Sequence, residues 1–184
     1  EDYRTLQEKK EKLKQKIEEY RAKQQIVAPF RPLECDLHRV LHYRYITYRF
    51  GRIAVEFYHK MQKYLMDDLK AIFVEGERDE SYVYGVYFVS QAETQKVDAV
   101  FRSLHFERIE LKDEFEGTPD TAYRVLENEI ARVNLEIEDL DKQAGEMLAD
   151  RAPQLVAARD RLEELSNNFD VRKLAARMED KQED

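Results

Sequence analysis

The sequence contains few of the residues that cross-link or interrupt a chain. Its 184 residues include one cysteine, no tryptophan, five glycines and four prolines. A single cysteine, Cys35, cannot form a disulfide within the chain and excludes zinc-ribbon and CxxC patterns, so we interpret it as a buried or unreactive thiol. Glycine and proline are the main turn-forming residues, and their shortage is typical of long uninterrupted helices.

Long apolar runs are also missing. The longest stretches, such as residues 71 to 74, are four residues long, whereas a membrane-spanning helix needs about 20 apolar residues. We therefore expect no direct membrane insertion by this chain. The first residues resemble no signal peptide, and the missing initiator methionine predicts an excised fragment.

Motifs for catalysis or cofactor binding are missing as well. The five glycines are isolated, so there is neither a GxxxxGK[ST] phosphate loop nor a GxGxxG loop. His38 and His42 have the i, i+4 spacing of a helical metal site, but no third ligand pattern accompanies them. The 39 carboxylates are too numerous for their proximity to indicate acid-base catalysis. We expect no catalytic residue, no cofactor and no metal.

Charge is what the sequence has in abundance, with 38% charged residues and a net charge of −8. Apolar residues recur at spacings of three and four in residues 1 to 25 and again after Gly117, as in coiled-coil seams. Because both segments end on the same intervening region, we expect them to pair as an antiparallel coiled coil. Their net charges of +2 and −7 favour this pairing weakly. The predicted seam consists of Leu6, Leu13, Ile17, Tyr20, Leu126, Ile130, Val133, Ile137 and Leu140.

The second arm, residues 118 to 182, has a predicted start and predicted interruptions. Thr118 should cap the helix, and Pro119 suits its first turn. Pro153 predicts a kink or break near residues 150 to 153, and residues 166 to 168 offer a second break. The first arm reaches only to about residue 143 of the second. We therefore predict that the apolar stripe of residues 155 to 178 packs against a second copy of the chain or folds back.

Between the arms the hydrophobic period changes from helical to strand-like. Residues 26 to 42 are expected to form a connector with a short helix, after Pro29 and Pro32 end the first arm. Residues 43 to 112 then give a β-α-β-β-α-β order, which predicts an α+β fold with a ferredoxin-like lobe at the tip of the coiled coil. We expect strand order 4-1-3-2 and both helices on one face. The expected elements are strands 43–50, 70–75, 81–89 and 106–111, helix 54–66, and helix 91–105 opened by a capping box at Ser90.

Two other functions are open to a chain of this kind. The tyrosine-rich residues 84 to 88 loosely echo the base-stacking strand of an RNA-recognition domain. Residues 43 to 112 carry 11 basic and 11 acidic side chains, whereas binding to phosphate backbones needs a positive excess. A generic coiled-coil protein-interaction module is the other alternative. We expect no nucleic-acid partner.

Three segments together carry a family resemblance: residues 45 to 53, the strand 82 to 89, and residues 106 to 111 followed by 116 to 119. They resemble the cytosolic domain of subunit I of V-type and archaeal-type rotary ATPases, whose eukaryotic counterpart is subunit a. The likeness covers the whole chain in layout. Ala54 departs from the proline that would be expected after Arg52 and Ile53.

The resemblance implies a non-catalytic stator part of a proton- or sodium-translocating ATPase or ATP synthase. The lobe would bind the peripheral-stalk heterodimer, and the coiled coil would link it to the membrane sector on the cytoplasmic side. Other membrane-sector subunits would be contacted through regions missing here, and any homodimer would be a product of truncation. The stalk-binding residues are not identified by the sequence.

Overall fold

The computed structural model describes residues 2 to 64, 68 to 112 and 114 to 182, and the side chains of residue 64 and of residues 169 to 182 lie outside this description. The chain divides into two compact units. The lobe unit is Leu13–Asn134, and the helical unit combines Glu1–Lys12 with Leu135–Asp184. Helices α1 (Tyr3–Val27) and α5 (Pro119–Gln182) each contribute residues to both units.

The lobe unit is built on a four-stranded sheet with order β2-β3-β1-β4. Its strands are β1 (Ile46–Ala54), β2 (Ala71–Arg78), β3 (Tyr82–Ser90) and β4 (Glu107–Arg108). Every neighbouring pair is antiparallel. The predicted strand order 4-1-3-2, with β1 and β3 at the centre, is confirmed.

Helices α3 (Val55–Tyr64) and α4 (Thr94–Ser103) cover one face of this sheet. Tyr58 and Met61 of α3 and Phe101 of α4 share one buried cluster with Tyr87 of β3. The Tyr87 and Phe101 rings stack with their centroids 3.9 Å apart. Both helices therefore lie on a common face, as predicted, although the predicted residues 65 and 66 lie outside the described residues.

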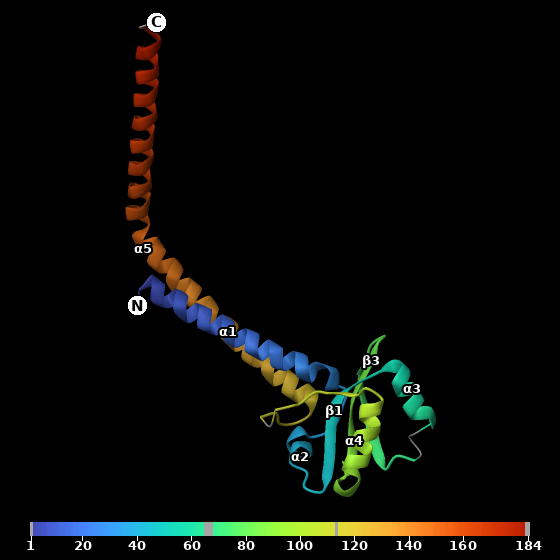
Figure 1. Cartoon of the computed structure of the whole chain (residues 1–184). Coiled ribbons are helices and arrows are strands. Elements are labelled where there is room, and N and C mark those ends of the chain that lie inside the picture. Colours follow the sequence, from blue (N-terminus) through green and yellow to red (C-terminus); the bar gives the residue numbers. More distant parts are fainter. Residues whose placement is uncertain (1, 65–67, 113, 183–184) are drawn as a thin grey trace. The chain divides into compact units, whose positions relative to one another are not determined.

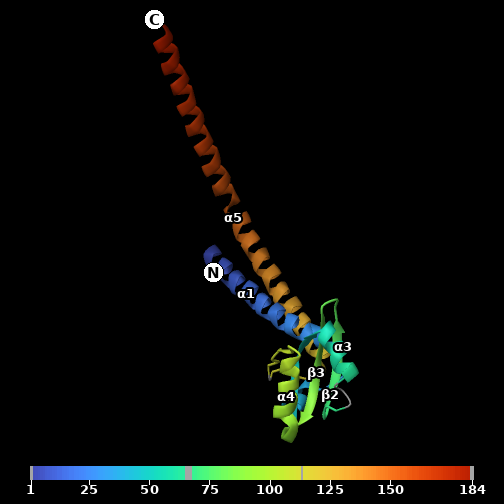
Figure 2. The same cartoon turned by 45° about the vertical axis from the view of Figure 1, so that its right-hand side comes forward.

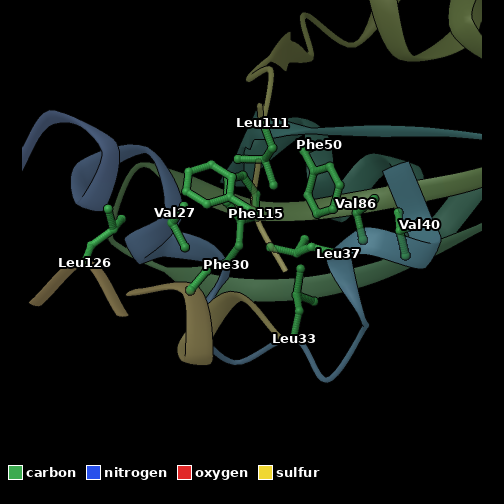
Figure 3. Close-up of a cluster of buried hydrophobic side chains, with 11 residues drawn as sticks. Val27, Phe30, Leu33, Leu37, Val40, Phe50, Val86, Leu111, Phe115 and Leu126 are labelled. Carbon is green, nitrogen blue, oxygen red and sulfur yellow. The ribbon is translucent and has the colours of Figure 1, made fainter. Parts of the chain in front are cut away.

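The opposite face is covered by the end of α1, the short helices η1 (Ala28–Phe30) and α2 (Leu37–Leu41), and the first turns of α5. Figure 3 shows Phe30 and Leu37 pointing toward Phe50 and Val86 of the sheet. The rings of Phe30 and Phe50 meet edge to face at 5.3 Å. Both faces of β3 are thus buried, as its continuous apolar sequence predicts.

Several predicted boundaries in the lobe are wrong. β1 does not stop before Gly51 but continues through it to Ala54. β2 continues past its predicted end at residue 75 to Arg78, through an irregular register between Glu75 and Arg78. The last strand is only two residues long. One further hydrogen bond to β1 follows it, from Ile109 N to the carbonyl of Phe50 at 2.8 Å.

The predicted capping box at Ser90 is also wrong. The Ser90 side chain makes no capping hydrogen bond, and a 3-10 turn, η2 (Gln91–Glu93), precedes α4. The hydroxyl of Thr94 lies 2.8 Å from the hydroxyl of Thr47 and donates to the carbonyl of Ser90. A tertiary contact from β1 therefore sets where α4 begins.

The start of α5 agrees with the prediction, whereas its predicted breaks do not occur. Thr121 N donates to the Thr118 hydroxyl at 3.1 Å, so Thr118 caps the helix. The helix then continues through Pro153 and residues 166 to 168 to Gln182 without a break or a fold-back. A proline removes a single backbone hydrogen bond, which the neighbouring turns tolerate here. A kink at Pro153 stays a prediction.

Candidate protein interface

Within the lobe unit, α1 and α5 pack side by side along the predicted seam (Figures 1 and 2). Ile17, Leu126 and Val133 are buried, and the predicted positions Leu13, Tyr20 and Ile130 are half-buried. Sequence reasoning missed a buried polar residue at this seam. Gln24 is 7% exposed and donates its side-chain amide to the carbonyl of Tyr123 at 3.4 Å.

Within the helical unit, the same two helices pair through Leu6, which is 2% exposed, and the buried Ala144. The predicted seam residues Ile137 and Leu140 are half-buried here. Lys10 occupies a seam position and its ammonium lies 2.6 Å from the Asp141 carboxylate. This hydrogen bond raises the pKa of Lys10. Heptad spacing places Lys10 in the same column as Ile17 but does not identify Asp141 as its partner.

Polar contacts hold the start of α5 against the end of α1. The Arg31 guanidinium lies 2.8 Å from the Asp120 carboxylate and 4.0 Å from the centre of the Tyr123 ring. Lys23 lies 2.8 Å from Glu114, and this hydrogen bond lowers the pKa of Glu114. These contacts supplement the apolar burial, because exposed ion pairs contribute only about 0 to 1 kcal/mol each.

A charged cluster lies between α4 and the sheet. Asp98 of α4 is 10% exposed and accepts a hydrogen bond from the Tyr87 hydroxyl at 2.5 Å. Its other oxygen faces Arg49 of β1 at 3.3 Å and Arg108 of β4 at 3.1 Å. Burial, and then the bond to Asp98, raises the pKa of Tyr87. Sequence reasoning missed this cluster because its members come from four separate elements.

The sequence offered three further residues for metal binding or reactivity, His38, His42 and Cys35, and each makes contacts within the fold. His42 Nδ1 donates to the carbonyl of His38 at 2.7 Å. Cys35 is half-buried against the core, and burial raises the pKa of its thiol. In the described residues, no three His, Cys, Asp or Glu side chains come together as a metal site requires. Among these same residues, no helix has both the length and the apolar content to cross a membrane.

The aromatic strand does not form an open platform for RNA bases. Tyr87 is buried beneath Phe101 on the α3–α4 face. On the opposite face, the Phe30 ring packs edge-on against Tyr84, with the centroids 6.3 Å apart. Base stacking requires exposed aromatic faces, so this observation argues against the RNA-recognition alternative.

Comparison with known proteins bears on the fold. No family model and no curated protein matches the chain. The chain is similar to a crystal structure of the cytoplasmic N-terminal domain of subunit I, homolog of subunit a, of V-ATPase, with a TM-score of 0.55 and 12% identity. The match covers 84% of this chain and 51% of that one, so this chain spans about half the length of the matched domain. At the level of the fold, the resemblance found in the sequence is confirmed.

Proposed function

We propose that the chain is a non-catalytic stator part of a V-type rotary ATPase or ATP synthase. Its lobe binds the peripheral-stalk heterodimer, and α1 and α5 form a coiled coil that links the lobe to the membrane sector on the cytoplasmic side. The fold likeness to subunit I carries this proposal. The strand order and the common face of α3 and α4 support a ferredoxin-like assignment for residues 43 to 112.

The packing of the chain suits a mechanical role. A stator must resist torque without performing chemistry itself, and apolar burial stabilises a helix pair more than exposed ion pairs do. The apolar seam of Leu6, Ile17 and Val133, with the flanking pair of Lys10 and Asp141, supplies such packing. Translocation of protons or sodium ions by the parent complex belongs to other parts of that complex.

Calorimetry with the purified peripheral-stalk heterodimer from the same organism tests the proposal. We expect a complex of modest affinity, because a single small contact usually binds weakly, and we expect no ATP hydrolysis by the chain. An unrelated antiparallel coiled coil of similar net charge is the control partner and should give no heat. Absence of any complex at high micromolar concentration, or equal binding to both partners, would contradict the proposal.

A further inference from the structure

One segment of the lobe carries positive charge without any acidic residue. Residues 37 to 55 contain four arginines and two histidines but no aspartate or glutamate, although 39 of the 184 residues are acidic. This acid-free segment comprises all of α2 and all of β1. A segment of this kind in a chain of net charge −8 attracts acidic partners.

A groove lies alongside the acid-free segment. Among the described residues, the ladder between β4 and β1 is limited to Gly51 and Arg52, with one further hydrogen bond from Ile109 N to the carbonyl of Phe50. Residues 46 to 49 of β1 therefore have no ladder partner on the β4 side. The resulting groove has a volume of about 440 Å³ and is lined by residues 43 to 44, 46 to 50 and 108 to 111, together with Gln91. We call it the β1 groove. A shape of this kind can take a segment of a partner protein.

The charges lining the β1 groove are unbalanced. Arg44, Arg49 and Arg108 line it, and Glu110 is the only acidic lining residue in the part of the chain that the structure describes. Asp98 lies behind Arg49 and Arg108 and positions both guanidinium groups. Arg49 Nε is buried and has no hydrogen-bond partner among the described residues.

Arg44 supplies the accessible charge. It is exposed, and no described residue forms an ion pair with it. Its neighbours add exposed apolar surface, because Tyr45 is 73% exposed and Tyr43 and Ile46 are also exposed. Tyrosine and arginine are the residue types that dominate binding energy at protein interfaces.

We propose that the β1 groove is where the lobe holds its stalk partner, and that this partner presents aspartate or glutamate side chains beside an apolar one. The inference rests on the proposed function and identifies its site. Arg44 and the positioned Arg49 and Arg108 pair with the acidic side chains, while Tyr43 and Ile46, which also line the groove, pack against the apolar one. Complementary charge of this kind mainly increases the association rate and the specificity.

Charge-reversal variants of the full chain test this assignment against the purified stalk heterodimer. Arg44→Glu should weaken binding at least tenfold, and Arg44→Ala and Tyr43→Ala should weaken it several-fold. The matched control is Lys96→Glu. Lys96 is exposed on α4 two positions before Asp98, and because successive helical residues rotate by about 100°, it points away from the groove. It should leave binding within twofold of the unaltered chain.

The outcomes separate the two proposals. If the unaltered chain binds and Arg44→Glu binds equally well, or if Lys96→Glu weakens binding as much, the groove assignment is wrong while the stator proposal stands. If the unaltered chain does not bind, both are overturned. Thermal unfolding of each variant shows whether it is folded. If Arg44→Glu does not fold, the binding of Arg44→Ala tests the groove assignment instead.

Discussion

Gly51 of β1 and Gly85 of β3 are register partners at the centre of the sheet, and an aromatic ring lies close to each of them. The ring of Phe106 approaches Gly51, and the ring of Phe73 approaches Gly85. Both rings belong to the cluster beneath α3 and α4. Side chains from distant segments thus fill the space that a side chain at either glycine would occupy.

Substitution of Gly51 by alanine should therefore destabilise the lobe. A Cβ there would overlap the carbonyl of Glu107 and the Phe106 ring, and overpacking of this kind costs about 1 to 3 kcal/mol. Gly145 of α5 is the matched control, because a Cβ there meets nothing within 4 Å. Gly145→Ala should stabilise the chain by about 0.5 to 1 kcal/mol. Urea denaturation measures both, and equal effects of the two substitutions would contradict the packing described.

Removal of the Asp98 charge should also destabilise the lobe. Asp98→Asn leaves Arg49 and Arg108 facing each other without their shared carboxylate, and we expect a loss of about 2 kcal/mol in the free energy of unfolding. The control is Glu129→Gln, which removes an exposed partner of Arg132 on the surface of α5. It should cost about 0.3 kcal/mol. A loss below about 0.5 kcal/mol for Asp98→Asn would show that the cluster contributes little.

The buried Tyr87 hydroxyl predicts a pH dependence. The pKa of Tyr87 is raised in the folded chain, so the folded state holds this proton more tightly than the unfolded state. The stabilising contribution is complete below the unfolded pKa of about 10 and is lost as the pH rises above it. Tyr87→Phe should therefore lose less stability than the unaltered chain between neutral pH and about pH 11. Parallel curves from urea denaturation at each pH would contradict this assignment.

The change of hydrophobic period was enough to predict the order of the strands and the face of the helices. It failed where a residue's role depends on a distant segment. Judged from its sequence neighbours, Gly51 predicts the end of a strand. In the fold, the strand continues and the Phe106 ring occupies the space that a side chain at Gly51 would fill. Ser90 looks like a capping residue, yet Thr47 pairs with Thr94 instead.

The sequence also predicted part of the interface between α1 and α5. The apolar seam follows from spacing, but the Lys10–Asp141 pair and the buried Gln24 require the register of two helices that are far apart in sequence. The acid-free segment 37 to 55 can be read directly from the sequence. This segment lines a groove because β4 pairs with only a short part of β1. No local sequence pattern indicates where that pairing stops.

The apolar stripe on the later part of α5 predicts self-association. Leu155, Val156, Leu162 and Leu165 are all exposed, and exposed apolar stripes usually mark contact sites. We expect light scattering of a dilution series to show a reversible dimer of the isolated chain. Leu162→Glu should shift the equilibrium to monomer, whereas Leu135→Glu, at an exposed position outside the stripe, should not. A strict monomer at all concentrations would refute this prediction.

Hydrogen exchange of the chain, measured with and without the stalk heterodimer, tests the central claim most directly, because it reports binding and its location together. We predict that backbone amides in residues 43 to 50 and 108 to 111 become protected in the complex. Amides of α3, which contributes no residue to the lining of the β1 groove, should be unchanged. Protection confined to α5, or no protection at saturating stalk concentration, would contradict the account.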